Sequence, residues 1–182
     1  MQKIFPIIKL AAQLAEVKRT VGYRDGHFEN DSEHSYQLAL VCWCANEQYN
    51  LGLNNELILK LALTHELVEI YAGDTDAFDN KEEISSQEIR EKLAIEKLNI
   101  EYANFKDILN SIKIYEEKNT DEAKLVCFLD KITPDVNIYN GDSTYHKDRK
   151  VTFDDWKKWL FRKIEYNFLN KKLKGLVDES VE

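Results

Sequence analysis

The sequence predicts an all-α protein that folds as one helical bundle. Glycine and proline are scarce, with 6 and 2 copies in 182 residues, and apolar residues recur at helical spacing in most segments. No stretch alternates β-branched and polar residues, so we predict no strand. The length suits a single domain, which we place at residues 1–175, with residues 176–182 as a frayed C-terminal tail.

The helices are predicted from apolar stripes and from signals at their ends. They cover approximately residues 6–17, 33–48, 55–72, 85–98, 105–117, 121–133 and 152–169. Ser32 is the expected N-cap of the second helix, Gly73 ends the third, and Pro134 breaks or bends the sixth. Thr152 and Asp155 resemble a capping box at the start of the last helix. The polar stretches 19–32, 74–81 and 140–151 are predicted loops.

Charge and composition argue against several classes of protein. The net charge of −8 disfavours a protein that binds a nucleic-acid duplex, because such binding needs a basic face. The apolar stretch at residues 4–12 is interrupted by Pro6 and Lys9 and is too short for a signal peptide or a membrane span. Three cysteines without a CxxC pair indicate reduced, buried thiols and a cytoplasmic protein.

Three of the predicted helices carry ionisable side chains on faces that are otherwise apolar. His65 continues the stripe of Leu57 and Leu61, and Glu69 follows one turn later on the same face. His34 and Asp130 also share their helix faces with apolar residues. Such groups are costly to bury unless they are paired or bind a metal.

Each of these signals is weak when taken alone. A lone histidine on a mixed face is usually a hydrogen-bonded structural residue, and Asp130 can pair with a neighbouring lysine at a solvated edge. Together, however, His34, His65, Glu66 and Asp130 offer two imidazoles and two carboxylates from three helices. That set suits a divalent transition-metal ion.

The same residues resemble the motifs of the HD superfamily of metal-dependent phosphohydrolases. The family pattern is a His on an early helix, a His-Asp doublet on a later one and a distant Asp, and His34, His65-Glu66 and Asp130 occupy these places. Residues 32–35, 63–75 and 122–131 resemble the extended motifs of the 5'-deoxynucleotidase-like branch. The doublet departs from the pattern, because Glu66 is one methylene longer than the family's Asp.

The resemblance implies an HD-domain helical bundle with one divalent metal ion, foremost Mn, Co or Mg. The implied ligands are His34, His65, Glu66 and Asp130. Homo-oligomers are common in such folds, so we expect a homodimer.

The resemblance also implies roles for other side chains. Arg19 would bind the phosphate, with a helix C-terminal arginine facing the dipole as the alternative. Glu69 would position or deprotonate the attacking water, or protonate the leaving oxygen. Asp74 would share that role or bind a sugar hydroxyl, unless it is an ordinary turn residue. Lys131 would be a second phosphate contact, with a solvated lysine as the alternative.

The sequence therefore predicts a metal-dependent phosphomonoester hydrolase. The foremost hypothesis is a 5'-nucleotidase that acts on (deoxy)ribonucleoside monophosphates and binds neither a nucleic-acid duplex nor a membrane. Three alternatives stay open: a hydrolase of another phosphate ester, a non-catalytic nucleotide- or metal-binding module, and a structural helical interaction protein.

Overall fold

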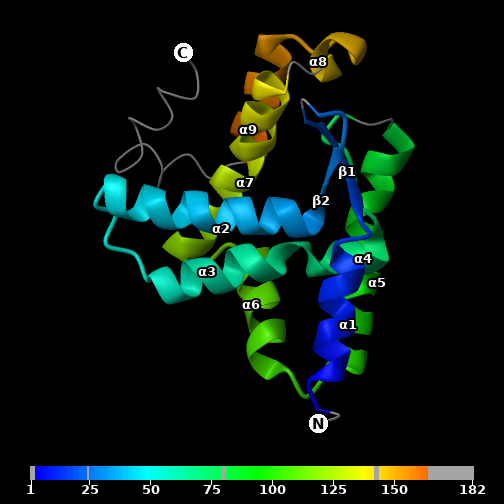
Figure 1. Ribbon diagram of the computed structural model, residues 1–182, viewed down its shortest axis with the longest axis vertical. Helices are drawn as coiled ribbons and strands as arrows, with labels where there is room; N and C mark the ends of the chain where they lie inside the picture. The colour runs from blue at the N-terminus through cyan, green and yellow to red at the C-terminus, as the bar shows by residue number, and fades with distance from the viewer. Residues whose placement is uncertain (1–2, 24, 79–80, 142–143, 164–182) are drawn as a thin grey trace.

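The computed structural model describes residues 3–23, 25–78, 81–141 and 144–163, which form helices and one small β-hairpin (Figure 1). The longer helices are α1 (Phe5–Leu14), α2 (Asp31–Gln48), α3 (Asn55–Thr64), α5 (Lys81–Glu101), α6 (Lys106–Glu117), α7 (Asp121–Asn140) and α9 (Phe153–Lys163). Two short helices, α4 (Glu69–Ala72) and α8 (Tyr145–Asp148), and one 3₁₀ turn, η1 (His65–Val68), complete the order. The predicted helical fold is confirmed. The predicted end of the last helix and the predicted tail lie outside the described residues.

The hairpin corrects the prediction that no strand exists. Strand β1 (Lys18–Gly22) pairs antiparallel with β2 (Phe28–Asn30) inside the stretch that we predicted to be a loop. The side chains that these strands bury include Arg19 and Glu29, whereas Phe28 is 60% exposed. The usual alternation of apolar and polar residues in a half-buried strand is therefore reversed at β2, and no pattern search for apolar periodicity detects it.

The start of α2 differs from the prediction by two residues. Asn30, not Ser32, is the N-cap, and its Oδ1 accepts hydrogen bonds from the backbone N–H groups of Ser32 and Glu33 at 3.0 and 3.1 Å. The Glu33 side chain accepts one in return from the Asn30 N–H at 3.0 Å, which completes a capping box. Because β2 runs directly into this cap, His34 is held in the first turn of α2.

The predicted helix 55–72 is divided at its functional centre. α3 ends at Thr64, the 3₁₀ turn η1 carries His65 and Glu66, and α4 follows. Gly73 ends the run as predicted, with a φ of 77° that an L-amino acid rarely adopts. Short 3₁₀ segments inside helices often mark functional positions, and all four residues of η1 are buried.

Helix α7 continues through Pro134 to Asn140, so the predicted break is wrong. Proline cannot donate the backbone hydrogen bond that α-helical geometry requires. Burial of Phe128, Leu129 and Ile138 on both sides of the proline keeps the two halves of α7 packed. Two smaller differences concern the ends of α5, which is longer than predicted, and α8, which lies in a predicted loop.

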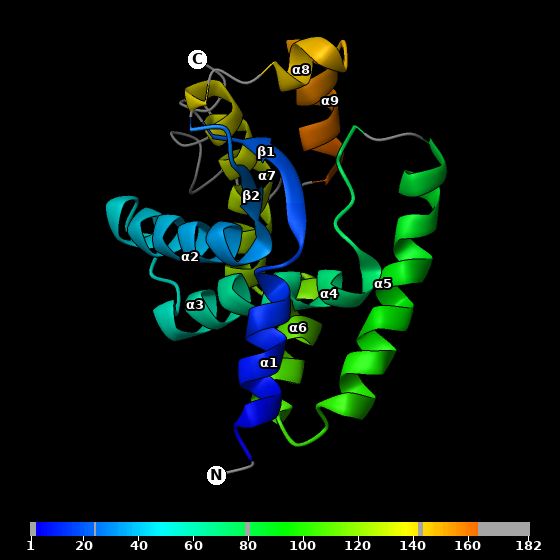
Figure 2. The same ribbon diagram turned by 45° about the vertical axis from the view of Figure 1, so that its right-hand side comes forward.

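Two apolar clusters flank the centre of the molecule. The larger joins α2, α3, α7 and α9 and includes the fully buried Leu38, Leu61, Phe128 and Leu160. The smaller joins α1, η1, α4, α5 and α6 and includes Leu10. Figures 1 and 2 show α2 lying over α3, while α4 connects α3 to the long helix α5. η1 therefore sits where the two clusters meet.

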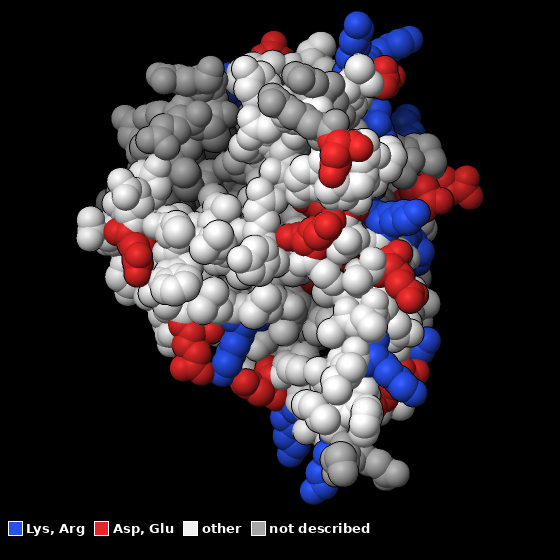
Figure 3. Space-filling view, viewed as in Figure 1, with Lys and Arg blue, Asp and Glu red and all other residues white. Residues whose placement is uncertain are grey.

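The surface over α2 carries few charged side chains (Figure 3). Tyr36, Leu40 and Trp43 of this helix are 69%, 47% and 42% exposed. The predicted homodimer stays a prediction.

Among the described residues, no helix combines the length and the hydropathy that crossing a membrane requires. The thiols of Cys42 and Cys127 are buried as expected, but that of Cys44 is exposed.

Candidate metal centre and active site

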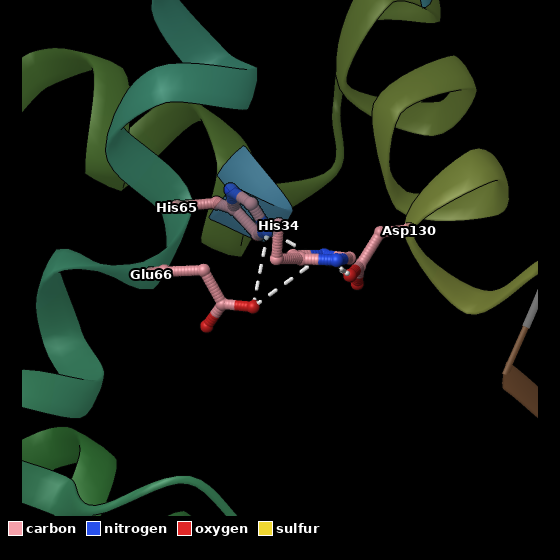
Figure 4. Close-up of side chains that lie close together, drawn as sticks. All are labelled: His34, His65, Glu66 and Asp130. Atoms are coloured by element: carbon pink, nitrogen blue, oxygen red, sulfur yellow. Dashed lines mark hydrogen bonds and ion pairs between the residues drawn. The ribbon is translucent and has the colours of Figure 1, made fainter. Parts of the chain in front are cut away.

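Four ionisable side chains from three segments converge on one point (Figure 4). They are His34 from the first turn of α2, His65 and Glu66 from η1, and Asp130 from the middle of α7. One ligand atom from each lies within 4.8 Å of the others, and all four residues are buried. The structure thus brings together every residue that the sequence proposed as a ligand, in a group that can hold a metal ion.

The imidazoles face the carboxylates through their Nε2 atoms. His34 Nε2 lies 3.0 Å from Asp130 Oδ1 and 3.6 Å from Glu66 Oε1. His65 Nε2 lies 3.4 Å from Glu66 Oε1 and 3.6 Å from Asp130 Oδ1. His65 Nδ1 donates to the Ala62 carbonyl at 2.9 Å, which leaves the Nε2 lone pair to face the cluster.

Asp130 is held in its ionised form by its neighbours. Its Oδ2 accepts hydrogen bonds from Tyr115 OH at 2.9 Å and from Lys131 Nζ at 2.7 Å, so Oδ1 is turned toward the imidazoles. Burial raises the pKa of this carboxyl, but Lys131 and the two histidines outweigh burial and hold it well below its usual range.

The cluster attracts positive charge. Burial lowers the pKa of His65, yet Glu66 and Asp130 raise it to about 10 in the ion-free protein. The same field that draws a proton to this imidazole attracts a metal ion, so the two compete for the site.

Arg19 extends from β1 into a group of carboxylates beside the cluster. Its Nη1 lies 2.5 Å from Glu66 Oε1 and 3.3 Å from Asp31 Oδ1, and its Nε lies 3.0 Å from Glu29 Oε2. Asp74 Oδ1 lies farther away, 3.8 Å from Nη1. Burial lowers the pKa of Arg19, but the carboxylates around it raise the pKa well above its usual value. The guanidinium therefore stays charged.

The buried charges around the cluster fit a divalent cation. Glu66 and Asp130 belong to the cluster, and Glu29 and Asp31 are wholly buried beside it. When all four are ionised, these carboxylates face two permanent cations, Arg19 and Lys131, so two negative charges remain for a cation to compensate. Burial and repulsion from Glu66 raise the pKa of Asp31 to about 8, as expected where negative charge is in excess. Nitrogen and oxygen donors in this combination suit a first-row divalent ion.

A cavity of ≈ 830 Å³ opens beside the cluster. Arg19, Glu69, Asp74 and Lys131 line it together with His65, Glu66 and Asp130, whereas His34 is wholly buried behind them. The residues that the sequence predicted to bind phosphate and to transfer protons thus line the same cavity as three of the four candidate metal ligands.

The two carboxyls proposed for proton transfer have different environments. Burial, followed by the charges of Glu66 and Asp74, raises the pKa of Glu69 to about 9. Glu69 Oε2 is buried and has no hydrogen-bond partner among the described residues. Burial also raises the pKa of Asp74, but Arg19 opposes it, and the result is about 6. Environments that separate two carboxyl pKa values are typical of an acid and a base in one active site.

The comparisons with known proteins agree with this geometry. The family model of the HD domain matches residues 11–172. The chain belongs to the HD domain family.

Proteins similar to this HD domain include 5'-deoxynucleotidases and a predicted metal-dependent phosphohydrolase. The 5'-deoxynucleotidase HDDC2 of Danio rerio is 32% identical over 136 residues, which cover 72% of this chain and 66% of that protein, just under two thirds of its length. HDDC2 of Homo sapiens is 30% identical over 154 residues and covers 82% of this chain and 74% of that protein. A solved structure described as a predicted metal-dependent phosphohydrolase, from Magnetospirillum magnetotacticum, has a TM-score of 0.73 and 25% identity, covering 97% of this chain and 90% of that one.

Several side chains that shape this HD domain site carry no signal in the sequence. Arg90 of α5 donates to the carbonyls of Ala72 and Gly73 and to Thr75 Oγ1, so it holds the segment that carries Asp74. The contact joins residues far apart in the chain. Because apolar periodicity reports burial and not polar pairing, only the fold reveals this interaction.

Asp76 is a second polar residue that holds the loop after α4, in this case against β1 and α8. Asp76 accepts hydrogen bonds from Thr20 at 2.8 Å, from Tyr145, and from the Phe78 backbone N–H at 2.8 Å, and Arg149 lies 2.7 Å away. β1, α8 and the loop are joined at this one buried carboxylate. Asp76 and Tyr145 both line the cavity.

Proposed function

We propose that this HD domain is a metal-dependent phosphomonoester hydrolase that acts on (deoxy)ribonucleoside 5'-monophosphates. The observation that carries the proposal is the convergence of His34, His65, Glu66 and Asp130 on one point beside a cavity that Arg19 also lines. The names of the Danio and human relatives, both 5'-deoxynucleotidases, support the choice of substrate.

The four clustered residues would hold one divalent ion, foremost Mn, Co or Mg. Bound there, the ion supplies Lewis acidity toward a phosphoryl oxygen and lowers the pKa of a water molecule. His34 and His65 contribute neutral nitrogen donors, while Glu66 and Asp130 contribute the charge that offsets the ion.

Arg19 and Lys131 would bind the phosphate. A guanidinium offers paired donors that match two phosphate oxygens, and the Arg19 side chain, 12% exposed, lies at the cavity wall. A phosphate dianion would replace part of the contact between Arg19 and Glu66, which would leave Glu66 available as a ligand of the ion. Lys131 is 30% exposed and bound to Asp130, so it would contribute charge at the opposite side of the cluster.

Glu69 and Asp74 would divide the proton transfers. Asp74, with the lower pKa, accepts the proton of the attacking water. Glu69, with the higher pKa, donates a proton to the leaving 5'-oxygen. Arg19 lowers the pKa of Asp74, so Glu69 is the carboxyl that holds its proton to the higher pH.

One part of the cavity lining suits a nucleoside. It is an apolar and aromatic group in which Phe78 packs with Ile138 and Tyr145, and the Phe78 and Trp159 ring centroids lie 5.7 Å apart. Asp130 and Ile138 lie eight residues apart on α7, which is about 12 Å of helix. That length is comparable with a nucleoside 5'-monophosphate whose phosphate lies at the ion and whose base lies against the aromatic group.

The direct test is a phosphate-release assay on a panel of nucleoside 5'-monophosphates with Mn, Co and Mg. Turnover is expected in the wild type and in Asp107→Asn, which changes an exposed aspartate of α6. Asp130→Asn should lose both the ion and turnover, whereas Glu69→Ala should lose turnover and keep the ion. Nucleotide binding without turnover would instead indicate a non-catalytic module, and absence of both ion and nucleotide binding would indicate an interaction protein.

The substrate class has its own test. Trp159→Ala should raise KM for nucleoside monophosphates but not for deoxyribose 5-phosphate, which lacks a base. Equal turnover of both compounds by the wild type would favour a hydrolase of other phosphate esters.

Buried, reduced thiols at two of the three cysteines support a cytoplasmic location.

A further inference from the structure

We propose that Glu29 is a positioning residue that orients both His34 and Arg19, and thereby couples the ion site to phosphate binding. Neither the sequence pattern nor the family motifs that we identified assign a role to this residue. Its action on Arg19 rests on the proposed function, whereas its action on His34 requires only that the cluster binds an ion.

Glu29 is a carboxylate without any exposure to solvent, on the inward face of β2. The guanidinium of Arg19, 3.0 Å away, supplies the opposite charge. A buried charge is costly unless its neighbours compensate it. The contacts of the two Glu29 carboxylate oxygens show which neighbours compensate this charge.

One oxygen anchors the carboxylate to the frame. Oε1 accepts hydrogen bonds from Tyr23 OH at 2.9 Å and from Asn137 Nδ2 at 3.0 Å. The Asn137 amide is itself fixed by Gln37, through two hydrogen bonds of 2.7 and 2.9 Å. The hairpin, α2 and α7 therefore determine together where Glu29 lies.

The other oxygen lies between the ion site and the phosphate site. Oε2 is 3.5 Å from His34 Nδ1 and 3.0 Å from Arg19 Nε. A carboxylate behind an imidazole favours the tautomer with its proton on Nδ1, which leaves the Nε2 lone pair for a cation. His34 Nε2 is the atom that faces Asp130 and Glu66. In His65, the Ala62 carbonyl accepts a hydrogen bond from Nδ1, so the Nε2 lone pair of this imidazole also faces the cluster.

The contact between Glu29 and Arg19 links Glu29 to the proposed phosphate site. Glu29 forms an ion pair with the Nε edge of the guanidinium, while Nη1 contacts Glu66 at the cavity wall. An arginine that is held along one edge presents its remaining donors in a fixed plane, as recognition of phosphate requires. One carboxylate thus sets the direction of a ligand and of a phosphate donor.

The test compares Glu29→Gln with Glu56→Gln, a matched control that makes the same substitution at an exposed position of α3. Mn²⁺ affinity is measured from the electron paramagnetic resonance signal of the free ion, and inorganic phosphate binding is measured as inhibition of turnover. Glu29→Gln should weaken Mn²⁺ binding by about 10- to 100-fold and weaken phosphate inhibition as well. Glu56→Gln should change neither by more than a small factor. Circular dichroism and thermal melting establish that each variant is folded.

A purely structural role for Glu29 predicts a lower melting temperature with unchanged Mn²⁺ affinity, and that result would overturn the proposal. If Glu29→Gln does not fold, Glu29→Asp carries the test in the same direction, because its shorter carboxylate withdraws from His34 and Arg19. If the wild type releases no phosphate from any nucleotide but Glu29→Gln still weakens Mn²⁺ binding, the proposed function fails and the orientation of His34 by Glu29 stands.

Discussion

Arg19 compensates buried negative charge, so its removal should destabilise the ion-free protein in a pH-dependent manner. The side chain is 12% exposed and lies 2.5, 3.3 and 3.0 Å from Glu66, Asp31 and Glu29. Removing one partner of a buried ion pair costs about 3–5 kcal/mol. For a chain of this size, each kcal/mol lowers Tm by about 2–4 °C. Arg19→Gln should therefore lower Tm at pH 8 by roughly 6–20 °C.

The effect of pH has a definite sign. Without Arg19, the carboxylates have pKa values above those in the unfolded chain, so the native state binds more protons than the unfolded state. Stability of the variant therefore falls as pH rises from 5.5 to 8. Asp31, whose pKa is about 8 even beside Arg19, already follows this direction.

The assay is thermal unfolding at pH 5.5 and pH 8, in a chelator and then with excess Mn²⁺. Lys92→Gln is the control, because it removes a lysine paired with Glu88 at an exposed position of α5 and should leave Tm unchanged. Mn²⁺ should recover part of the loss in Arg19→Gln, since the ion replaces the missing positive charge. Equal Tm values for the variant and the wild type at pH 8, or an equal loss at both pH values, would refute the reasoning.

Three further predictions concern proton transfer, the loop and the hairpin. Glu69→Gln should reduce kcat on nucleoside monophosphates by about 10²- to 10⁴-fold but much less on p-nitrophenyl phosphate, whose leaving group needs no proton; equal losses in steady-state assays would contradict the acid role. Arg90→Met should release the segment around Asp74 and lower kcat by roughly 10-fold or more, while Mn²⁺ affinity, measured by titration, stays constant. Gly141→Ala would place a Cβ 2.5 Å from the Gly22 carbonyl oxygen, so urea unfolding should show a loss of about 1–3 kcal/mol; an unchanged midpoint would show that the hairpin does not rest on this close approach.

The sequence located His34, His65 and Asp130 because each of them interrupts an apolar helix face, and it located Glu66 through the resemblance of the His65-Glu66 doublet to the family motif. His65 follows Leu57 and Leu61 at four-residue spacing, and the fold buries both Leu61 and His65. A polar residue on such a stripe needs a compensating partner once it is buried, and local spacing alone reveals that requirement. The start of α3 and the end of α6 follow from equally local signals.

The parts that the sequence missed depend on contacts between distant segments. Arg19 and Glu29 occupy inward positions of the hairpin, where apolar side chains are expected. They are compatible with burial because they pair with each other and because Glu66 and Asn137, from distant segments, contact them as well. The continuation of α7 past Pro134 likewise depends on packing against α2 and β1. Local propensity does not contain this information, since the compensating partner lies elsewhere in the chain.

The central claim, that the four convergent side chains hold a divalent ion, is tested most directly by a crystal structure of the Mn²⁺-loaded protein with anomalous diffraction data. The account predicts one strong anomalous peak within bonding distance of the Nε2 atoms of His34 and His65 and of carboxylate oxygens of Glu66 and Asp130. A peak elsewhere in the cavity, or none at saturating Mn²⁺, would contradict it.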